Sequence, residues 1–173
     1  MALSWNEIKD RALKFSNEWE GESRERAEKD SFWNDFFNVF GISRRRLATF
    51  EEPVKKLSGN QGFIDLFWKG TLLVEHKSKG RDLDAAFTQA TDYFHGIKEH
   101  ELPQYVLVSD FEKFKLYDLD SREEHEFELK DFHKNIKLFG FIAGYQKRSF
   151  KEEDPVNIKA AELMGKLHDE LED

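Results

Sequence analysis

Residues 62–80 read GFIDLFWKGTLLVEHKSKG and contain two apolar runs, typical of strands, joined by a short loop. Each run carries an acid, Asp65 in the first and Glu75 in the second, and Lys77 follows Glu75 by two positions. Side chains alternate between the two faces of a strand, so Glu75 and Lys77 share one face. An odd loop centred on Gly70 would set Asp65 beside Glu75, whereas a two-residue loop would place them on opposite faces. With the odd loop, the stretch predicts a hairpin on which three charges meet.

Two carboxylates side by side on a largely buried sheet are costly unless something positive neutralises them. Lys77 can pair with one of them and leave the other to a metal ion. Mg²⁺ prefers one or two carboxylates, a backbone carbonyl and waters, which Asp65, Glu75 and the backbone carbonyl of His76 could supply. The lysine would orient a water or help to deprotonate it, and the metal would stabilise charge on a phosphoryl oxygen. This is chemistry for phosphodiester hydrolysis.

A structural ion-pair cluster is the alternative interpretation of the same three charges. Acid-x-Lys triplets are common by chance in a chain with 36% charged residues, and a single example is usually a surface ion pair. The side chain of His76 alternates onto the apolar face of its strand. There we expect a packed core histidine rather than a metal ligand.

The composition indicates one domain with a sizeable core, because the chain has 173 residues with 39% hydrophobic and 14% aromatic content. It contains no cysteine, which excludes a disulfide framework, a zinc ribbon and a thiol nucleophile. The first twenty residues are too charged for a signal peptide, and no apolar run has the length of a membrane span. We therefore expect a cytoplasmic protein, without a membrane partner.

The formal net charge of -8 hides a basic middle segment. Residues 41–81 contain nine Lys or Arg against four Asp or Glu. If an anionic polymer binds this chain, we expect it near this segment. The alternative is that the basic runs at 43–46 and 55–56 are solvated faces.

Hydrophobic periodicity predicts a mixed sheet with a crossover helix, a fold of the α/β class with α+β character. The predicted helices cover residues 5–19, 23–41, 81–100 and 157–173, and the second of them ends at the glycine stop Gly41. The predicted strands cover residues 49–56, 62–68, 71–78, 104–110, 113–119 and 124–129.

The second predicted helix supplies a further acid. At about 100° per residue, the centre of its apolar stripe lies near Lys29 and Phe36. Glu25 lies nearer that direction than Glu28 does. Glu25 is therefore the acid that we expect to point inward.

These residues resemble a known nuclease signature. Asp65, nine intervening residues and then EHK at 75–77 resemble the PD-(D/E)XK signature, and QATDY at 89–93 is similar to the QxxxY element of its RecB-like branch. Glu25 resembles the acid that many such folds supply from their first core helix. The resemblance implies a restriction-endonuclease-like core, a mixed central sheet flanked by helices, with further helices at both ends of the chain.

The resemblance extends from about Ser31 to the end of the chain. Residues 32–56, 62–94, 105–119, 135–145 and 154–171 resemble the amino-terminal nuclease portion of type IIL restriction-modification enzymes. In those enzymes the nuclease precedes a helical connector, an adenine-specific DNA methyltransferase and a target-recognition domain. This chain is much shorter, so we expect a nuclease domain over 1–155 and the start of the connector over 156–173.

The resemblance implies roles for individual residues. Asp65 and Glu75 would hold Mg²⁺, for which Mn²⁺ would substitute, and Lys77 would activate the water. Gln89 and Tyr93, four residues apart on the crossover helix, would support the site; without the family, a solvated glutamine and a half-buried packing tyrosine are the simpler interpretations. Basic side chains would contact DNA phosphates without reading the sequence. The candidate phosphate contacts are Arg44, Arg45, Arg46, Lys55, Lys56, Lys79 and Arg81.

The sequence thus predicts a Mg²⁺-dependent endonuclease domain that cuts double-stranded DNA at sites chosen by other domains. Its partners would be the methyltransferase and target-recognition domains, S-adenosylmethionine would bind only in the methyltransferase, and transient dimerisation would serve double-strand cleavage. The host would be a prokaryote. The alternative is a non-catalytic DNA-binding or docking scaffold that retains the nuclease fold.

Overall fold

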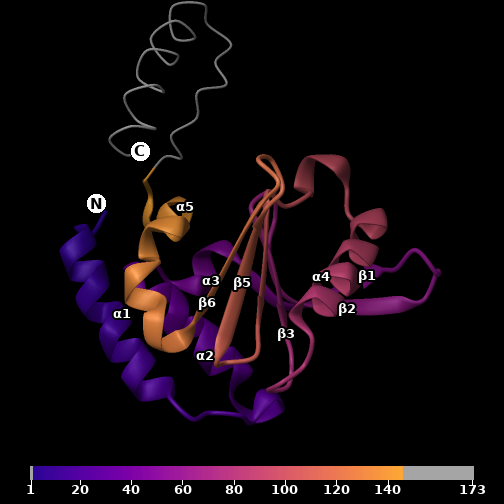
Figure 1. Ribbon diagram of the computed structural model, residues 1–173. Coiled ribbons are helices and arrows are strands. Elements are labelled where there is room, and N and C mark those ends of the chain that lie inside the picture. Colours follow the sequence, from indigo (N-terminus) through magenta and orange to yellow (C-terminus); the bar gives the residue numbers. More distant parts are fainter. Residues whose placement is uncertain (1, 146–173) are drawn as a thin grey trace, which may run out of the picture.

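The computed structural model describes residues 2–145, whose strands form one six-stranded mixed sheet with helices on both faces (Figure 1). The strands in sheet order are β1 (Thr49–Lys55), β2 (Gln61–Trp68), β3 (Leu72–His76), β4 (Tyr105–Ser109), β5 (Lys113–Asp118) and β6 (Glu123–Glu128). Strands β3 and β4 are parallel, and all other neighbours are antiparallel. The predicted mixed sheet is confirmed, and each predicted strand matches an observed one to within about two residues.

Strands β2 and β3 form the predicted hairpin with the odd loop. Leu66 lies opposite Val74 and Trp68 lies opposite Leu72, so the pairing is centred on Gly70. Gly70 has φ +77°, in the left-handed region where a glycine carries no steric cost. This register brings residues 65 and 75 to the same end of the hairpin.

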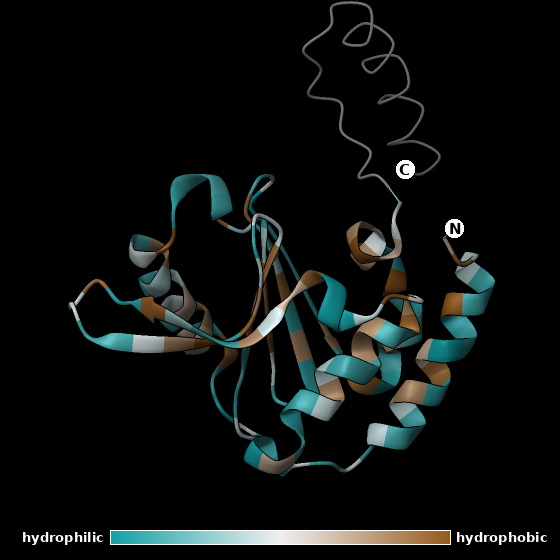
Figure 2. Ribbon diagram, turned by 180° about the vertical axis from the view of Figure 1, so that it is seen from behind, coloured by the Kyte–Doolittle hydropathy of each residue, from teal (hydrophilic) through white to brown (hydrophobic). Residues whose placement is uncertain are grey.

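One face of the sheet is covered by α1 (Trp5–Trp19) and α2 (Glu25–Val39), whose apolar sides meet a core rich in aromatic rings (Figures 1 and 2). Helix α1 begins at Ser4, whose hydroxyl accepts a hydrogen bond from the backbone N–H of Glu7. Helix α2 ends just before Gly41, which has φ +76° and is the predicted glycine stop. Of these two helices, α2 is the one whose side chains reach the hairpin formed by β2 and β3.

The opposite face is covered by α4 (Leu83–Asp92), the predicted crossover helix (Figure 1). The prediction that this helix continues to residue 100 is wrong. After Asp92 the chain forms two short 3-10 helices, η1 (Tyr93–Gly96) and η2 (Glu99–Glu101). Gly96, the last residue of η1, lies so close to the backbone of Lys55 that a Cβ would collide with the Lys55 carbonyl oxygen.

Four short elements were not predicted. They are the helices α3 (Arg44–Leu47) and α5 (Gly140–Ala143) and the 3-10 helices η3 (Leu129–Lys134) and η4 (Ile136–Phe139). Phe132 and Phe139, of η3 and η4, complete the aromatic core beneath α1 and α2. The predicted helix at 157–173 and the boundary between 155 and 156 lie outside the described residues. Among the helices of residues 2–145, none is long and apolar enough to cross a membrane.

Candidate active site

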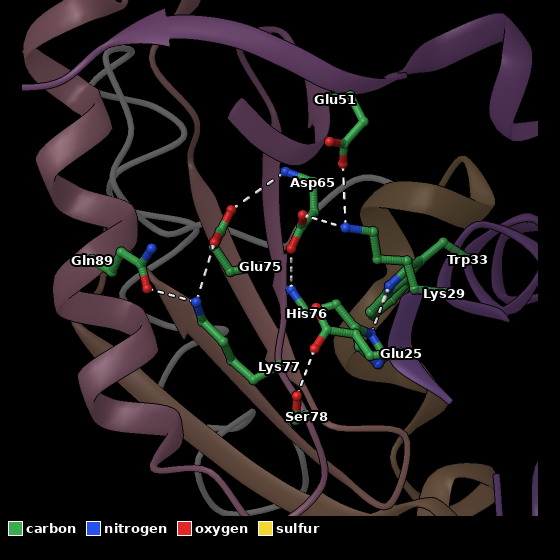
Figure 3. Close-up of polar contacts among 10 residues, drawn as sticks. All are labelled: Glu25, Lys29, Trp33, Glu51, Asp65, Glu75, His76, Lys77, Ser78 and Gln89. Atoms are coloured by element: carbon green, nitrogen blue, oxygen red, sulfur yellow. Dashed lines mark hydrogen bonds and ion pairs between the residues drawn. The ribbon is translucent and has the colours of Figure 1, made fainter. Parts of the chain in front are cut away.

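Asp65 and Glu75 meet where β2 and β3 separate (Figure 3). The backbone N–H of Asp65 donates to Glu75 Oε2 at 3.3 Å. The backbone N–H of His76 donates to Asp65 Oδ2 at 2.7 Å. Side-chain carboxylates therefore take the place of strand-to-strand hydrogen bonds at this end of the hairpin, and the two acids are held together by the backbone of each other's strand.

Glu75 is the more deeply buried of the two acids, with 2% of its surface exposed. Burial, followed by the negative charge of Asp65, raises the pKa of Glu75 to about 8. The ammonium of Lys77 acts in the opposite direction, with its Nζ 3.9 Å from Glu75 Oε1. Burial therefore favours the protonated form of Glu75 when no cation is bound.

Lys77 follows the last residue of β3 and reaches toward α4. Its Nζ donates a 2.6 Å hydrogen bond to Gln89 Oε1, as Figure 3 shows. Gln89 also lies beside Tyr93, which is buried, and acts on its hydroxyl. Burial, with the charges of Glu75 and Asp65, raises the pKa of Tyr93 to about 12, so this hydroxyl stays protonated. The structure therefore joins Lys77, Gln89 and Tyr93 in one chain of contacts, which neither a solvated glutamine nor a half-buried packing tyrosine describes.

Glu25, the first residue of α2, is partly buried and lies on the side of the site away from α4. It accepts a hydrogen bond of 2.8 Å from the hydroxyl of Ser78. Glu25 therefore contacts the loop that follows Lys77, and the described hydrogen bonds and ion pairs do not connect it directly to Asp65 or Glu75.

The side chain of His76 lies in the aromatic core, as predicted. Its Nδ1 accepts a 3.0 Å hydrogen bond from Trp33 Nε1, and its ring packs against Phe111 at 4.2 Å between centroids. Burial and, secondarily, the charge of Lys29 lower the pKa of His76 to about 3, so the ring is neutral. The role of its backbone carbonyl as a metal ligand stays a prediction.

Sequence reasoning missed Lys29 and Glu51 as members of the site. Lys29 Nζ, on α2, lies 2.8 Å from Asp65 Oδ1 and 3.2 Å from a carboxylate oxygen of Glu51 on β1. Burial alone would lower the pKa of Lys29, but the hydrogen bonds and charges of Asp65 and Glu51 together outweigh it and raise the pKa. A lysine at the centre of an apolar stripe was the available signal for a buried ion pair.

The candidate phosphate contacts differ in how freely they face solvent. The Arg44 guanidinium donates at 2.8 Å to both Asn34 Oδ1 and the Ala48 carbonyl, and lies 4.0 Å from the centre of the Phe50 ring. Lys79 Nζ is 3.7 Å from a carboxylate oxygen of Glu112. Lys56 lies over the Tyr93 ring, with Nζ 6.0 Å from its centre. The side chains that are exposed and have no such contact among those described are Arg45, Arg46, Lys55 and Arg81.

The donor set at this site fits a hard divalent cation. Two adjacent carboxylates are held on a common backbone frame, and the buried one has a raised pKa that a cation would offset. Within residues 2–145 there is no group of three or more Asp, Glu or His side chains arranged to hold a metal. Asp65 and Glu75 would therefore hold such an ion together with backbone or water oxygens.

Comparisons with known proteins agree with this fold. The sequence model of a family described as "MmeI, N-terminal domain" matches residues 10–173. A curated relative named "DNA methyltransferase A", from Bacillus subtilis (strain 168), is 23% identical over 148 residues, which are 84% of this chain and 16% of the relative. A solved structure titled "cryoEM structure DrdV-DNA complex" aligns with a TM-score of 0.50 and 15% identity, covering 85% of this chain and 14% of that one. The chain thus spans about one sixth of the length of these proteins.

Proposed function

The chain belongs to the MmeI N-terminal domain family of type IIL restriction-modification enzymes, and from this premise we propose that it is a Mg²⁺-dependent nuclease domain that hydrolyses DNA phosphodiester bonds. The observation that carries the proposal is the meeting of Asp65, Glu75 and Lys77 at one end of a hairpin, with Gln89 in contact with Lys77. The PD-(D/E)XK-like fold, a mixed sheet between helices, supports it.

Each side chain has a role that its contacts suit. Asp65 and Glu75 bind the metal ion, because their carboxylates are adjacent and held by backbone N–H groups. Lys77 is about one fifth exposed, so its ammonium reaches the substrate while Gln89 fixes its direction. It orients the attacking water and stabilises the negative charge that develops as the water attacks the phosphorus. A Mg²⁺ ion held by Asp65 and Glu75 would supply Lewis-acid polarisation of the phosphoryl group and would offset charge in the transition state.

Gln89 and Tyr93 support the site without touching the reacting atoms. Gln89 accepts a hydrogen bond from Lys77 and contacts the protonated Tyr93 hydroxyl. Tyr93 is buried, so its position is fixed, and it supports this chain of contacts. Glu25 holds Ser78, and with it the loop that carries Lys77 and Lys79.

DNA phosphates would meet the basic side chains around the site. Lys55 and Arg81 are exposed on the segments that flank β2 and α4. Contacts of this kind position DNA without selecting a sequence, so target choice belongs to other domains. Arg44 is engaged by Asn34 and Phe50, so we assign it to the fold first and to DNA second.

The chain matches only a short part of each of these proteins, which supports a larger parent enzyme. We propose that this enzyme also carries an adenine methyltransferase, which uses S-adenosylmethionine, and a target-recognition domain. Two copies would associate transiently on DNA to cut both strands. The setting that fits a restriction enzyme is the prokaryotic cytoplasm.

Replacement of Asp65 by Ala in the full-length enzyme tests the proposal. We expect Mg²⁺-dependent cleavage to be lost while methylation of the same DNA continues, because the methyltransferase is a separate domain. Cleavage at the normal rate by this variant would contradict the assignment. Absence of cleavage and of divalent-ion binding in the unmodified enzyme would instead support the non-catalytic scaffold.

A further inference from the structure

The Asp65 carboxylate is shared between the proposed metal site and an ion pair that lies behind it. Lys29 Nζ contacts Asp65 Oδ1 at 2.8 Å and Glu51 at 3.2 Å (Figure 3). The side chains of Lys29 and Asp65 are 17% and 14% exposed, whereas that of Glu51 is 53% exposed. Lys29 is therefore a partly buried cation that lies between Asp65, a partly buried acid of the site, and Glu51, a more exposed acid on β1.

Glu51 has an unusual backbone conformation that serves this contact. Its φ is +52°, in the left-handed region that residues with a Cβ rarely adopt. The ladder between β1 and β2 is paired on both sides of Glu51 but skips it and Asp65. This break in the strand directs the Glu51 carboxylate toward Lys29, as Figure 3 shows.

We propose that Lys29 and Glu51 form a counter-ion pair that sets the affinity of the site for its divalent cation, an inference that rests on the proposed function. Without metal, Lys29 neutralises Asp65 beside Glu75. With metal, Lys29 opposes the incoming positive charge, and Glu51 weakens that opposition by sharing the ammonium. The two residues therefore act on metal binding with opposite signs.

The test measures Mn²⁺ binding to the 173-residue chain by electron paramagnetic resonance of the free ion. Lys29→Met should bind Mn²⁺ about tenfold more tightly, the order expected for loss of one unit charge next to a metal-binding carboxylate. Glu51→Gln should bind it several-fold more weakly, and Lys29→Arg should bind it as the unmodified chain does. The matched control is Lys69→Met, which removes an exposed lysine 3.7 Å from Glu101 at the other end of the hairpin.

Opposite shifts in the two variants support the counter-ion pair. A weaker or unchanged affinity for Mn²⁺ in Lys29→Met would overturn it. If Lys29 only held Asp65 in place, its removal would weaken metal binding. An unchanged or tighter affinity in Glu51→Gln would overturn it as well. Glu51→Gln retains the length of the side chain and alters an exposed group, so it keeps the test open even if Lys29→Met folds poorly.

A second measurement separates this inference from the proposed function. If the unmodified chain binds no Mn²⁺, the metal assignment fails. Thermal unfolding in the presence of chelator then tests separately whether Lys29 neutralises Asp65. Lys29→Met should lower the melting temperature when Asp65 is intact. The same substitution should lower it clearly less in a protein that already carries Asp65→Asn. Equal losses in both backgrounds would show that Lys29 does not neutralise Asp65.

Discussion

Lys77 donates a 2.6 Å hydrogen bond to Gln89, and this contact joins the loop after β3 to helix α4. The contact gives the ammonium a fixed direction, although Lys77 has a long and flexible side chain. A lysine that must meet a phosphate and a water needs such an anchor, because small errors of position are costly in catalysis. Each part of this arrangement predicts a measurable effect.

Replacement of Gln89 by Leu should slow DNA cleavage by the full-length enzyme by about 10- to 100-fold, because Lys77 loses its anchor. The loss should appear in kcat, with KM for DNA nearly unchanged, since Gln89 is not a phosphate contact. Steady-state cleavage kinetics check this. Thr88→Ala, at the neighbouring exposed position of α4, is the control. A change confined to KM would contradict the anchoring role.

The raised pKa of Glu75 predicts how stability depends on pH in chelator. The folded-state pKa of about 8 lies above the ordinary 4.5, so the folded protein binds this proton more tightly than the unfolded chain does. Its contribution to stability is complete below about pH 4.5 and is lost as the pH rises through about 8. The free energy of unfolding should therefore fall in this window relative to Glu75→Gln, as urea titrations would show. Parallel pH profiles for the two proteins would contradict it.

Trp33→Phe should destabilise the protein by about 1–3 kcal/mol through the hydrogen bond alone, because Nδ1 of buried His76 loses its donor. The smaller ring adds to this loss. Urea unfolding of Trp5→Phe, which alters a half-buried ring stacked on Tyr145, provides the comparison. An equal or smaller loss at Trp33 would argue against the importance of the indole contact for His76.

Gly62→Ala should destabilise the protein by about 1–3 kcal/mol, because the added methyl group would be crowded against Tyr93 and Lys56. A Cβ at Gly62 would lie 2.8 Å from a ring carbon of Tyr93 and 2.8 Å from Cε of Lys56. The lysine can move aside, but the buried tyrosine cannot. Circular dichroism melts should show this loss, with Ser58→Ala in the exposed turn between β1 and β2 as the control. A neutral substitution would mean that Tyr93 is free to shift.

The register of the hairpin followed from the sequence on the condition that its loop is odd, and the structure meets that condition. Strand side chains repeat with a period of two, so fixing the loop on Gly70 also fixed the relation between residues 65 and 75. The strands were predictable for the same reason. The end of the crossover helix at Asp92 was not, because apolar residues continue at helical spacing beyond it, at Phe94 and Ile97.

The contacts of Lys29 and Glu51 with the site could not be derived from the local sequence pattern. Lys29 and Asp65 are 36 positions apart and meet only when α2 packs on the sheet. The left-handed backbone of Glu51 has no sequence signal, since the residue is not glycine. Likewise, a run of three arginines indicates basic charge, but only the packed structure shows that Arg44 is bound by Asn34.

The most direct test of the account is single-turnover DNA cleavage by the full-length enzyme with Lys77 replaced by Ala. The lysine is proposed to act on the water, so its loss should slow Mg²⁺-dependent cleavage by about 1,000-fold. DNA binding and methylation should remain, and Lys69→Ala, at the other end of the hairpin, should cut normally. Cleavage by the Lys77 variant at the rate of the unmodified enzyme would contradict the proposed active site.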